Sequence, residues 1–208
     1  MDFTLNEEQV AIRETCREFA EQEIRPRAEE MDRTGNFPYD LIHKMGELGL
    51  LGLPFPEAYG GAGADFLSYC LAIEEISRGD VSVGITMEAH TSLGACPFYL
   101  FGSQAQKEHY LTPLASGEQL WAFGLTEPEA GSDAGGTQTR AVLREGNWHI
   151  NGSKSFITNA GTAMTGGVTI TAVTGRRSDG KGVQPELRSA TRAGSPNLPQ
   201  ARQHLGRR

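Results

Sequence analysis

The sequence contains little cysteine and no long apolar run. Its three cysteines, Cys16, Cys70 and Cys96, lie far apart and have no C-x-x-C spacing, which indicates neither a disulfide framework nor a zinc site. No stretch is long and apolar enough to span a bilayer, and the first residues have neither the basic nor the apolar region of a signal peptide. We therefore expect a soluble, cytoplasmic protein with no metal site and no membrane span.

Basic residues are scarce outside the last part of the chain. The formal net charge is −7, yet residues 175–208 carry eight arginines and lysines against two acidic residues. The body is therefore strongly acidic, which argues against a nucleic-acid-binding core. Large apolar residues are few in 175–208 and follow no helical or strand period, so we expect a disordered basic tail there.

Residues 1–118 have the pattern of an all-helical domain. Asn6 followed by Gln9 predicts a capping box at the start of the first helix. Residues 81–96 are apolar and rich in small side chains, which predicts a buried central helix. His90 lies within that segment, and we interpret it as a hydrogen-bonded core residue rather than a catalyst.

Residues 119–174 change to the period of two that is typical of strands. The fold class that this order predicts is α+β, with a helical domain first and a partial β domain after it. A turn is expected at residues 145–147. Strands are expected at residues 120–125, 140–144, 148–150, 156–158 and 168–174.

The stretch 124–136 combines hydroxyls, carboxylates and glycines in a way that core packing does not require. Pro128 ends the preceding strand because it lacks a backbone donor. Thr126 and Ser132 offer hydroxyl groups, and the glycines permit the close approach of another molecule. A loop facing a polar, flat or anionic ligand is one interpretation, and a surface turn rich in small residues is the other.

Two motifs in this region resemble the flavin-contacting core of the acyl-CoA dehydrogenase family. The first is Leu-Thr-Glu-Pro at 125–128 followed by Ala-Gly-Ser-Asp at 130–133. The second is Asn-Gly at 151–152, then Lys154, then Phe-Ile-Thr-Asn at 156–159. The resemblance extends from about residue 3 to residue 174. It implies an N-terminal helical domain and the beginning of a β-barrel-like domain, in a truncated chain without the family's C-terminal helical bundle.

The resemblance also implies a chemistry and a set of contacts. FAD would take a hydride from an acyl-CoA thioester, and electron-transfer flavoprotein would take the electrons. Gly131 and Ser132 would meet the substrate, and Phe156 would cover one face of the flavin ring. The implied cofactor-binding residues are Phe123, Gly124, Leu125, Thr126, Phe156, Ile157 and Thr158.

No residue of the chain is expected to be catalytic. The family's base is a glutamate of the missing bundle, so Glu127, Glu129 and Asp133 are expected to bond backbone amides around the loop. We therefore expect an inactive, truncated acyl-CoA dehydrogenase, and the family's homotetramer is doubtful for this chain. Two alternatives stay open at this point: a non-enzymatic helical interaction module, and a fragment of a related acyl-CoA oxidase or nitroalkane oxidase.

Overall fold

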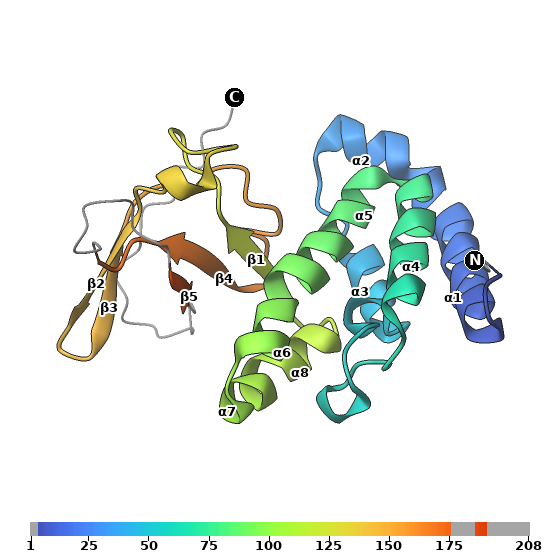
Figure 1. Cartoon of the computed structure of the whole chain (residues 1–208). Coiled ribbons are helices and arrows are strands. Elements are labelled where there is room, and N and C mark those ends of the chain that lie inside the picture. The colour runs from blue at the N-terminus through green and yellow to red at the C-terminus, as the bar shows by residue number, and fades with distance from the viewer. Residues whose placement is uncertain (1–3, 176–185, 191–208) are drawn as a thin grey trace.

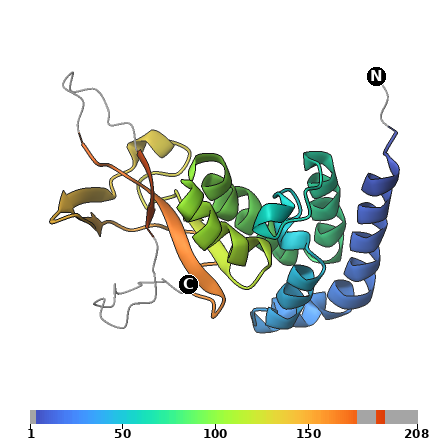
Figure 2. The ribbon, with the colours of Figure 1, turned by 90° about the horizontal axis from the view of Figure 1, so that it is seen from below.

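The computed structural model describes residues 4–175 and 186–190 and has a helical part followed by a β part (Figure 1). The helical part lies at one end of the molecule and the strands at the other (Figure 2). The α-helices are α1 (Glu7–Phe19), α2 (Ala28–Thr34), α3 (Tyr39–Glu47), α4 (Phe66–Gly79), α5 (Val81–Glu88), α6 (Cys96–Phe101), α7 (Gln104–Gln106) and α8 (Thr112–Ala115). The strands are β1 (Leu120–Gly124), β2 (Arg140–Arg144), β3 (Asn147–Asn151), β4 (Thr165–Ala172) and β5 (Glu186–Ala190).

Shorter helical segments connect these elements. The π-helical segments are η1 (Ala20–Ile24), η5 (Ala89–Ala95) and η6 (Lys107–Leu111). The 3₁₀ segments are η2 (Arg25–Arg27), η3 (Leu50–Gly52), η4 (Glu57–Tyr59) and η7 (Ala134–Gly136). The α+β class with helices before strands is confirmed.

The first helix begins at the predicted capping box. Asn6 Oδ1 accepts a hydrogen bond from the Gln9 amide at 2.8 Å, and Gln9 Oε1 accepts one from the Asn6 amide at 3.0 Å. These reciprocal bonds satisfy two amides that the helix itself cannot pair. The capping-box prediction is confirmed.

The central helix runs through α5, η5 and α6 in sequence. Met87 and His90 are fully buried, as predicted, but Val81, Ile85 and Leu93 are exposed. The expectation of a buried central helix is thus confirmed for one face and wrong for the other. Since the three exposed residues are spaced by four and by eight positions, they form one stripe along the helix.

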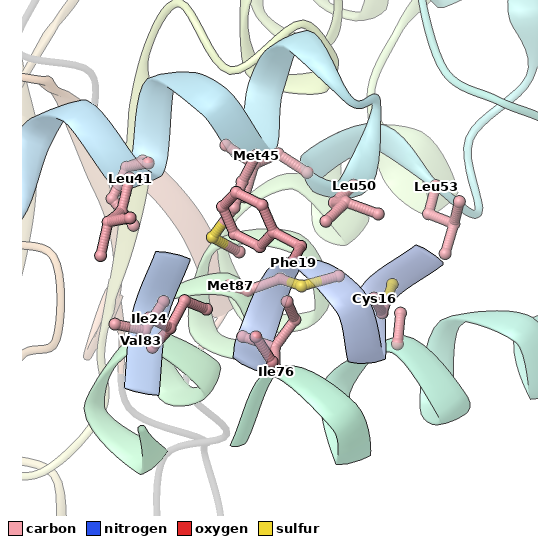
Figure 3. Packing of buried hydrophobic residues seen from close by; sticks show 14 of the residues in the cluster. Cys16, Phe19, Ile24, Leu41, Met45, Leu50, Leu53, Ile76, Val83 and Met87 are labelled. Carbon is pink, nitrogen blue, oxygen red and sulfur yellow. The ribbon is translucent and has the colours of Figure 1, made fainter. Parts of the chain in front are cut away.

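Apolar side chains of the helical part form two clusters. The first brings together α1, α3, α4 and α5 around Phe19, Met45 and Met87 (Figure 3). The second lies around Phe98, Leu111 and Trp121. Leu120 belongs to the first cluster and Trp121 to the second, so strand β1 completes the packing of both.

Strand β1 also begins the main sheet, whose order is β1-β4-β5. It pairs with β4 in parallel, and β4 pairs with β5 antiparallel. Strands β2 and β3 form a separate antiparallel hairpin, and Glu145 and Gly146 make its turn with positive φ angles. The turn expected at 145–147 is confirmed.

Two expectations for the β part differ from the structure. Residues 156–158 do not form a strand but lie in a turn, where Phe156 and Asn159 have φ angles of 57° and 67°. Strand β5 lies within the segment 175–208 that was expected to be disordered, so that expectation is wrong for 186–190. The rest of that segment, apart from residue 175, lies outside the described residues. Among the described residues, no helix is long and apolar enough to cross a membrane.

Candidate functional site

The loop after β1 folds back on itself in a tight turn. The Glu127 amide donates to the Ala130 carbonyl at 2.9 Å, and the Ala130 amide donates to the Glu127 carbonyl at 3.2 Å. Pro128 and Glu129 form the exposed tip of this turn. Gly131 and Ser132 follow it on the surface, and a Cβ atom added to Gly131 would meet nothing within 4 Å.

Glu127 is the buried carboxylate of this loop. It accepts hydrogen bonds from the Gln138 amide at 2.6 Å and the Thr139 amide at 3.0 Å. The expectation that it bonds backbone amides is confirmed. The same expectation is wrong for Glu129 and Asp133. Their side chains make no hydrogen bond to a backbone amide within the described residues.

The pKa of Glu127 reflects these contacts. Burial alone would raise it, but the hydrogen bonds from Lys154 and from the two backbone amides outweigh burial and lower the pKa to about 2. The carboxylate is therefore ionised at neutral pH. Because its oxygens already accept three hydrogen bonds, it is poorly placed to take a proton from another molecule.

Lys154 lies at the centre of the same contacts. Its Nζ donates to Glu127 Oε1 at 2.7 Å, to the Leu125 carbonyl at 2.9 Å and to Thr171 Oγ1 at 3.0 Å. These bonds use all three donors of the ammonium group. Its stem passes over Gly124, where an added Cβ atom would lie 3.3 Å from Lys154 Cγ, so Gly124 makes room for the lysine.

The next residues run beside the loop. The Ser155 amide donates to the Thr126 carbonyl at 2.8 Å, which joins the two sequence motifs in space. Phe156 follows, with 93% of its surface exposed. Asn159 ends the segment and donates from Nδ2 to the Thr86 carbonyl of α5 at 3.0 Å.

The seven predicted cofactor residues lie on two segments that the Ser155–Thr126 hydrogen bond joins. Phe123 and Gly124 lie in β1, and Leu125 and Thr126 follow directly. Phe156, Ile157 and Thr158 lie on the adjoining segment that Ser155 and Asn159 anchor. The hydroxyl groups of Thr126 and Thr158 make no hydrogen bond within the described residues, so both can bond a ligand.

Sequence reasoning missed the threonines that support the site. Thr171 receives a bond from Lys154, and Thr169 receives one from the Trp121 indole at 2.9 Å. Their alternate positions on the predicted strand at 168–174 were the available signal, since residues i and i+2 share one face of a strand. Thr139 was also missed; its buried hydroxyl finds no partner within the described residues.

A cavity of about 490 Å³ lies beside the Glu127 turn. It is lined by the turn and by the base of the β2–β3 hairpin, including Thr139, Arg140 and Ser153. The exposed ring of Phe156 is not part of its lining. The cavity is therefore separate from the junction that carries the predicted cofactor residues. No cluster of metal-ligating side chains occurs in the described part of the chain.

Two protein-family models together match nearly the whole described chain. The model of the acyl-CoA dehydrogenase N-terminal domain matches residues 6–118, and that of the middle domain matches residues 122–189. The resemblance therefore continues past residue 174, where the sequence analysis ended it.

Individual proteins agree with these matches. A probable acyl-CoA dehydrogenase of Bacillus subtilis, YngJ, is 54% identical over 183 residues, which are 88% of this chain and 48% of the relative. Butyryl-CoA dehydrogenase from Megasphaera elsdenii is 40% identical with a TM-score of 0.83, over 94% of this chain and 51% of that structure. An acyl-CoA dehydrogenase complexed with FAD, from Bacillus anthracis, is 38% identical with a TM-score of 0.75, over 89% and 32%. The chain spans about half the length of the curated relatives it matches.

Proposed function

Since this chain belongs to the acyl-CoA dehydrogenase family, we propose that it holds FAD at the junction of the Thr126 loop and the Phe156–Thr158 segment. In this proposal the chain supplies the flavin-facing part of an FAD-dependent acyl-CoA dehydrogenase. The relative from Bacillus anthracis is complexed with FAD, which supports this choice of cofactor.

The observation that carries the proposal is the exposed ring of Phe156. A bulky residue with positive φ is strained, and here the φ angle is 57°. The ring gains no core packing in return, because 93% of the residue is exposed. Phe156 is therefore not a core residue of the described structure. A flat aromatic surface held in a strained conformation beside free hydroxyls suits a planar ring such as the isoalloxazine.

The other residues fit the polar edge of the same ring. The Thr126 and Thr158 hydroxyls have no partner within the described residues. Each would contribute about 1 kcal/mol net as a hydrogen bond to the flavin. Phe123, Gly124, Leu125 and Ile157 would supply apolar and backbone contact around them.

Gly131 and Ser132 are proposed to meet the thioester end of the substrate. Both are exposed, and the turn at Glu127–Ala130 fixes the chain just before them. The substrate proposed is a short acyl-CoA, because the matched enzyme of Megasphaera elsdenii is a butyryl-CoA dehydrogenase. Electron-transfer flavoprotein is the electron acceptor that the family resemblance implies. A cytoplasmic location stays a prediction from the cysteine pattern.

When bound, FAD would accept the hydride from the β-carbon of the acyl group. Removal of the α-proton needs a positioned base, which typically contributes roughly 10²- to 10⁴-fold to the rate. Glu127 is committed to Lys154 and two amides, and Glu129 lies at the exposed tip of the turn. We therefore propose that this chain does not dehydrogenate acyl-CoA. We also propose that it binds FAD weakly, because the Thr126 and Thr158 hydroxyls would each contribute only about 1 kcal/mol.

Two other functions are kept as alternatives. A non-enzymatic interaction module would have the scaffold but no flavin, and an acyl-CoA oxidase or nitroalkane oxidase relative would bind flavin and react with oxygen or a nitroalkane. Flavin binding separates the module from both enzyme classes. The reaction of the bound flavin with each class of substrate then separates the enzymes.

The experiment is a flavin titration of the full chain. Quenching of FAD fluorescence is measured for the wild type, for Phe156→Ala and for Phe66→Ala, which truncates a ring that is also largely exposed but lies on α4. We expect weaker binding for Phe156→Ala only. No binding by the wild type, or equal binding by all three proteins, contradicts the proposal.

A second step tests catalysis. Short and long acyl-CoAs are added without oxygen to the FAD-saturated chain, and the yellow absorbance band is followed. The proposal expects unchanged colour. Rapid bleaching would mean that a base exists within the chain, and Glu127→Gln and Glu129→Gln would identify it.

A further inference from the structure

We propose that Lys154 is a positioning residue for the flavin-facing loop. Paired with Glu127, its ammonium group holds the Leu125 carbonyl and so sets the direction in which Thr126 presents its hydroxyl to the ligand. The inference rests on the proposed flavin site. It adds to it a residue that would touch the loop rather than the flavin.

The ammonium group of Lys154 has a complete set of hydrogen-bond acceptors. Its three donors reach the carbonyl of Leu125, the carboxylate of Glu127 and the hydroxyl of Thr171, at 2.7 to 3.0 Å. These acceptors belong to the residue that follows β1, to the turn and to β4. A single ammonium group therefore ties three segments together, and its side chain is only 10% exposed.

The backbone on both sides of Thr126 is held by hydrogen bonds. The carbonyl before it is held by Lys154, and its own carbonyl accepts the Ser155 amide at 2.8 Å. The peptide groups on both sides of Thr126 are therefore fixed in orientation. Its hydroxyl makes no bond within the described residues, so the only polar group of the residue's side chain is left for another molecule.

A second buried carboxylate among the described residues, Glu75, gives a comparison for this pair. Glu75 is paired with Arg17 at 2.6 Å and with Arg78 at 3.0 Å, but these arginine side chains stay 41% and 46% exposed, and the Arg17 pair joins two helices. In the Lys154–Glu127 pair, by contrast, the two side chains are only 10% and 4% exposed. Two buried charges lose much of their hydration, and apolar residues can replace such pairs without loss of stability. Stability alone is thus a weak reason for this pair, whereas fixed geometry at a binding loop is a sufficient one.

The test uses Lys154→Met, which keeps the length of the stem and removes the donors. Arg17→Met is the control, because it also removes a cation from a buried carboxylate but far from the loop, while Glu75 keeps its second partner, Arg78, at 3.0 Å. Amide hydrogen exchange is measured by mass spectrometry on the full chain without flavin. We expect exchange in residues 122–131 to rise about tenfold or more for Lys154→Met, as the loss of a charged hydrogen bond implies, and to stay unchanged for Arg17→Met.

FAD affinity per folded molecule is the second measurement. We expect Lys154→Met to weaken it by about tenfold or more, and Arg17→Met to leave it unchanged although the protein is less stable. If the wild type does not bind FAD, the proposed function fails, while the exchange data still decide whether Lys154 orders the loop. If FAD binds and Lys154→Met changes neither exchange nor affinity, Lys154 is not a positioning residue.

A double variant separates positioning from charge balance and covers the case in which Lys154→Met does not fold. Lys154→Met with Glu127→Gln removes both charges, so no unpaired carboxylate is left in the interior. We expect its stability to recover while its FAD affinity stays low, because the Leu125 carbonyl still lacks its donor. Recovery of affinity together with stability would mean that Lys154 only neutralises Glu127, which would overturn the proposal.

Discussion

Lowering the pH from 7 to 5 is expected to destabilise this protein through one residue, His90. The ring is fully buried and bridges two parts of the chain. Its Nδ1 lies 3.1 Å from the Trp121 amide, which must donate to it, and its Nε2 lies 3.0 Å from the Leu114 carbonyl, to which it must donate. The neutral form with its proton on Nε2 satisfies both contacts. A second proton on Nδ1 would face another donor.

The magnitude follows from the two protonation equilibria. Burial lowers the pKa of His90 from 6.5 to about 4 in the folded protein, although the Leu114 carbonyl acts in the opposite direction. The unfolded chain takes up the proton near pH 6.5, so the stabilisation is complete above that pH and is lost as the pH falls toward 4. Between pH 7 and pH 5 the free energy of unfolding should decrease by about 2 kcal/mol.

Urea unfolding followed by circular dichroism measures this effect at pH 7, 6 and 5. His90→Asn has an oxygen in place of Nδ1 and cannot titrate, so it should be less stable at pH 7 but nearly insensitive to pH. His43→Gln is the control, since His43 is exposed, and it should keep the wild-type slope. Equal slopes for the wild type and His90→Asn would refute the reasoning.

Three further predictions concern stability, and urea unfolding checks each of them. Gly94→Ala should destabilise by ~1–3 kcal/mol, because its Cβ would lie 2.7 Å from the Trp121 carbonyl; a neutral effect would mean that β1 can move away from η5. Ile76 is a fully buried residue of the first cluster, so Ile76→Ala should lower the free energy of unfolding by ~2–5 kcal/mol. Ile85 is exposed, so Ile85→Ala should lower it far less, and similar losses would contradict the described packing. As the pH falls below 4.5 toward the Glu127 pKa of about 2, the free energy of unfolding of the wild type should decrease by roughly 3 kcal/mol. Glu127→Gln should lack that decrease. The same pH dependence of stability in both proteins would count against the ionised pair.

Features set by neighbours in the sequence were predictable. The capping box of Asn6 and Gln9 needs only two side chains three residues apart, so its chemistry is complete in the local sequence. The burial of His90 was also predictable, because an apolar segment rich in small residues surrounds it. What could not be predicted was its bridging role, since Leu114 and Trp121 lie 24 and 31 residues away.

The candidate site depends on contacts between residues far apart in the sequence, so its conformation could not be predicted. Phe156 to Thr158 have strand-forming side chains, yet the segment is a turn because the Ser155–Thr126 and Asn159–Thr86 bonds hold its ends. Those bonds join residues 29 and 73 positions apart, and no local pattern encodes them. Lys154 was quoted as part of a motif, but its three acceptors become visible only when β1 and β4 lie side by side. Strand β5 was missed for a similar reason, since pairing with β4 supplies the order that composition does not.

Strand β1 packs in both apolar clusters of the helical part, and this has a consequence for the order of folding. Forty residues separate the end of β1 from the start of its partner β4, whereas the helices against which Leu120 and Trp121 pack all come before β1 in the chain. Closing the shorter loops first costs less entropy, and contacts near in sequence form faster. During synthesis β1 can therefore pack against the folded helices and stay there as an unpaired strand until β4 has been made. The helical layer then acts as a template from which the sheet grows, and substitutions at Trp121 should slow the folding of the strands more than that of the helices.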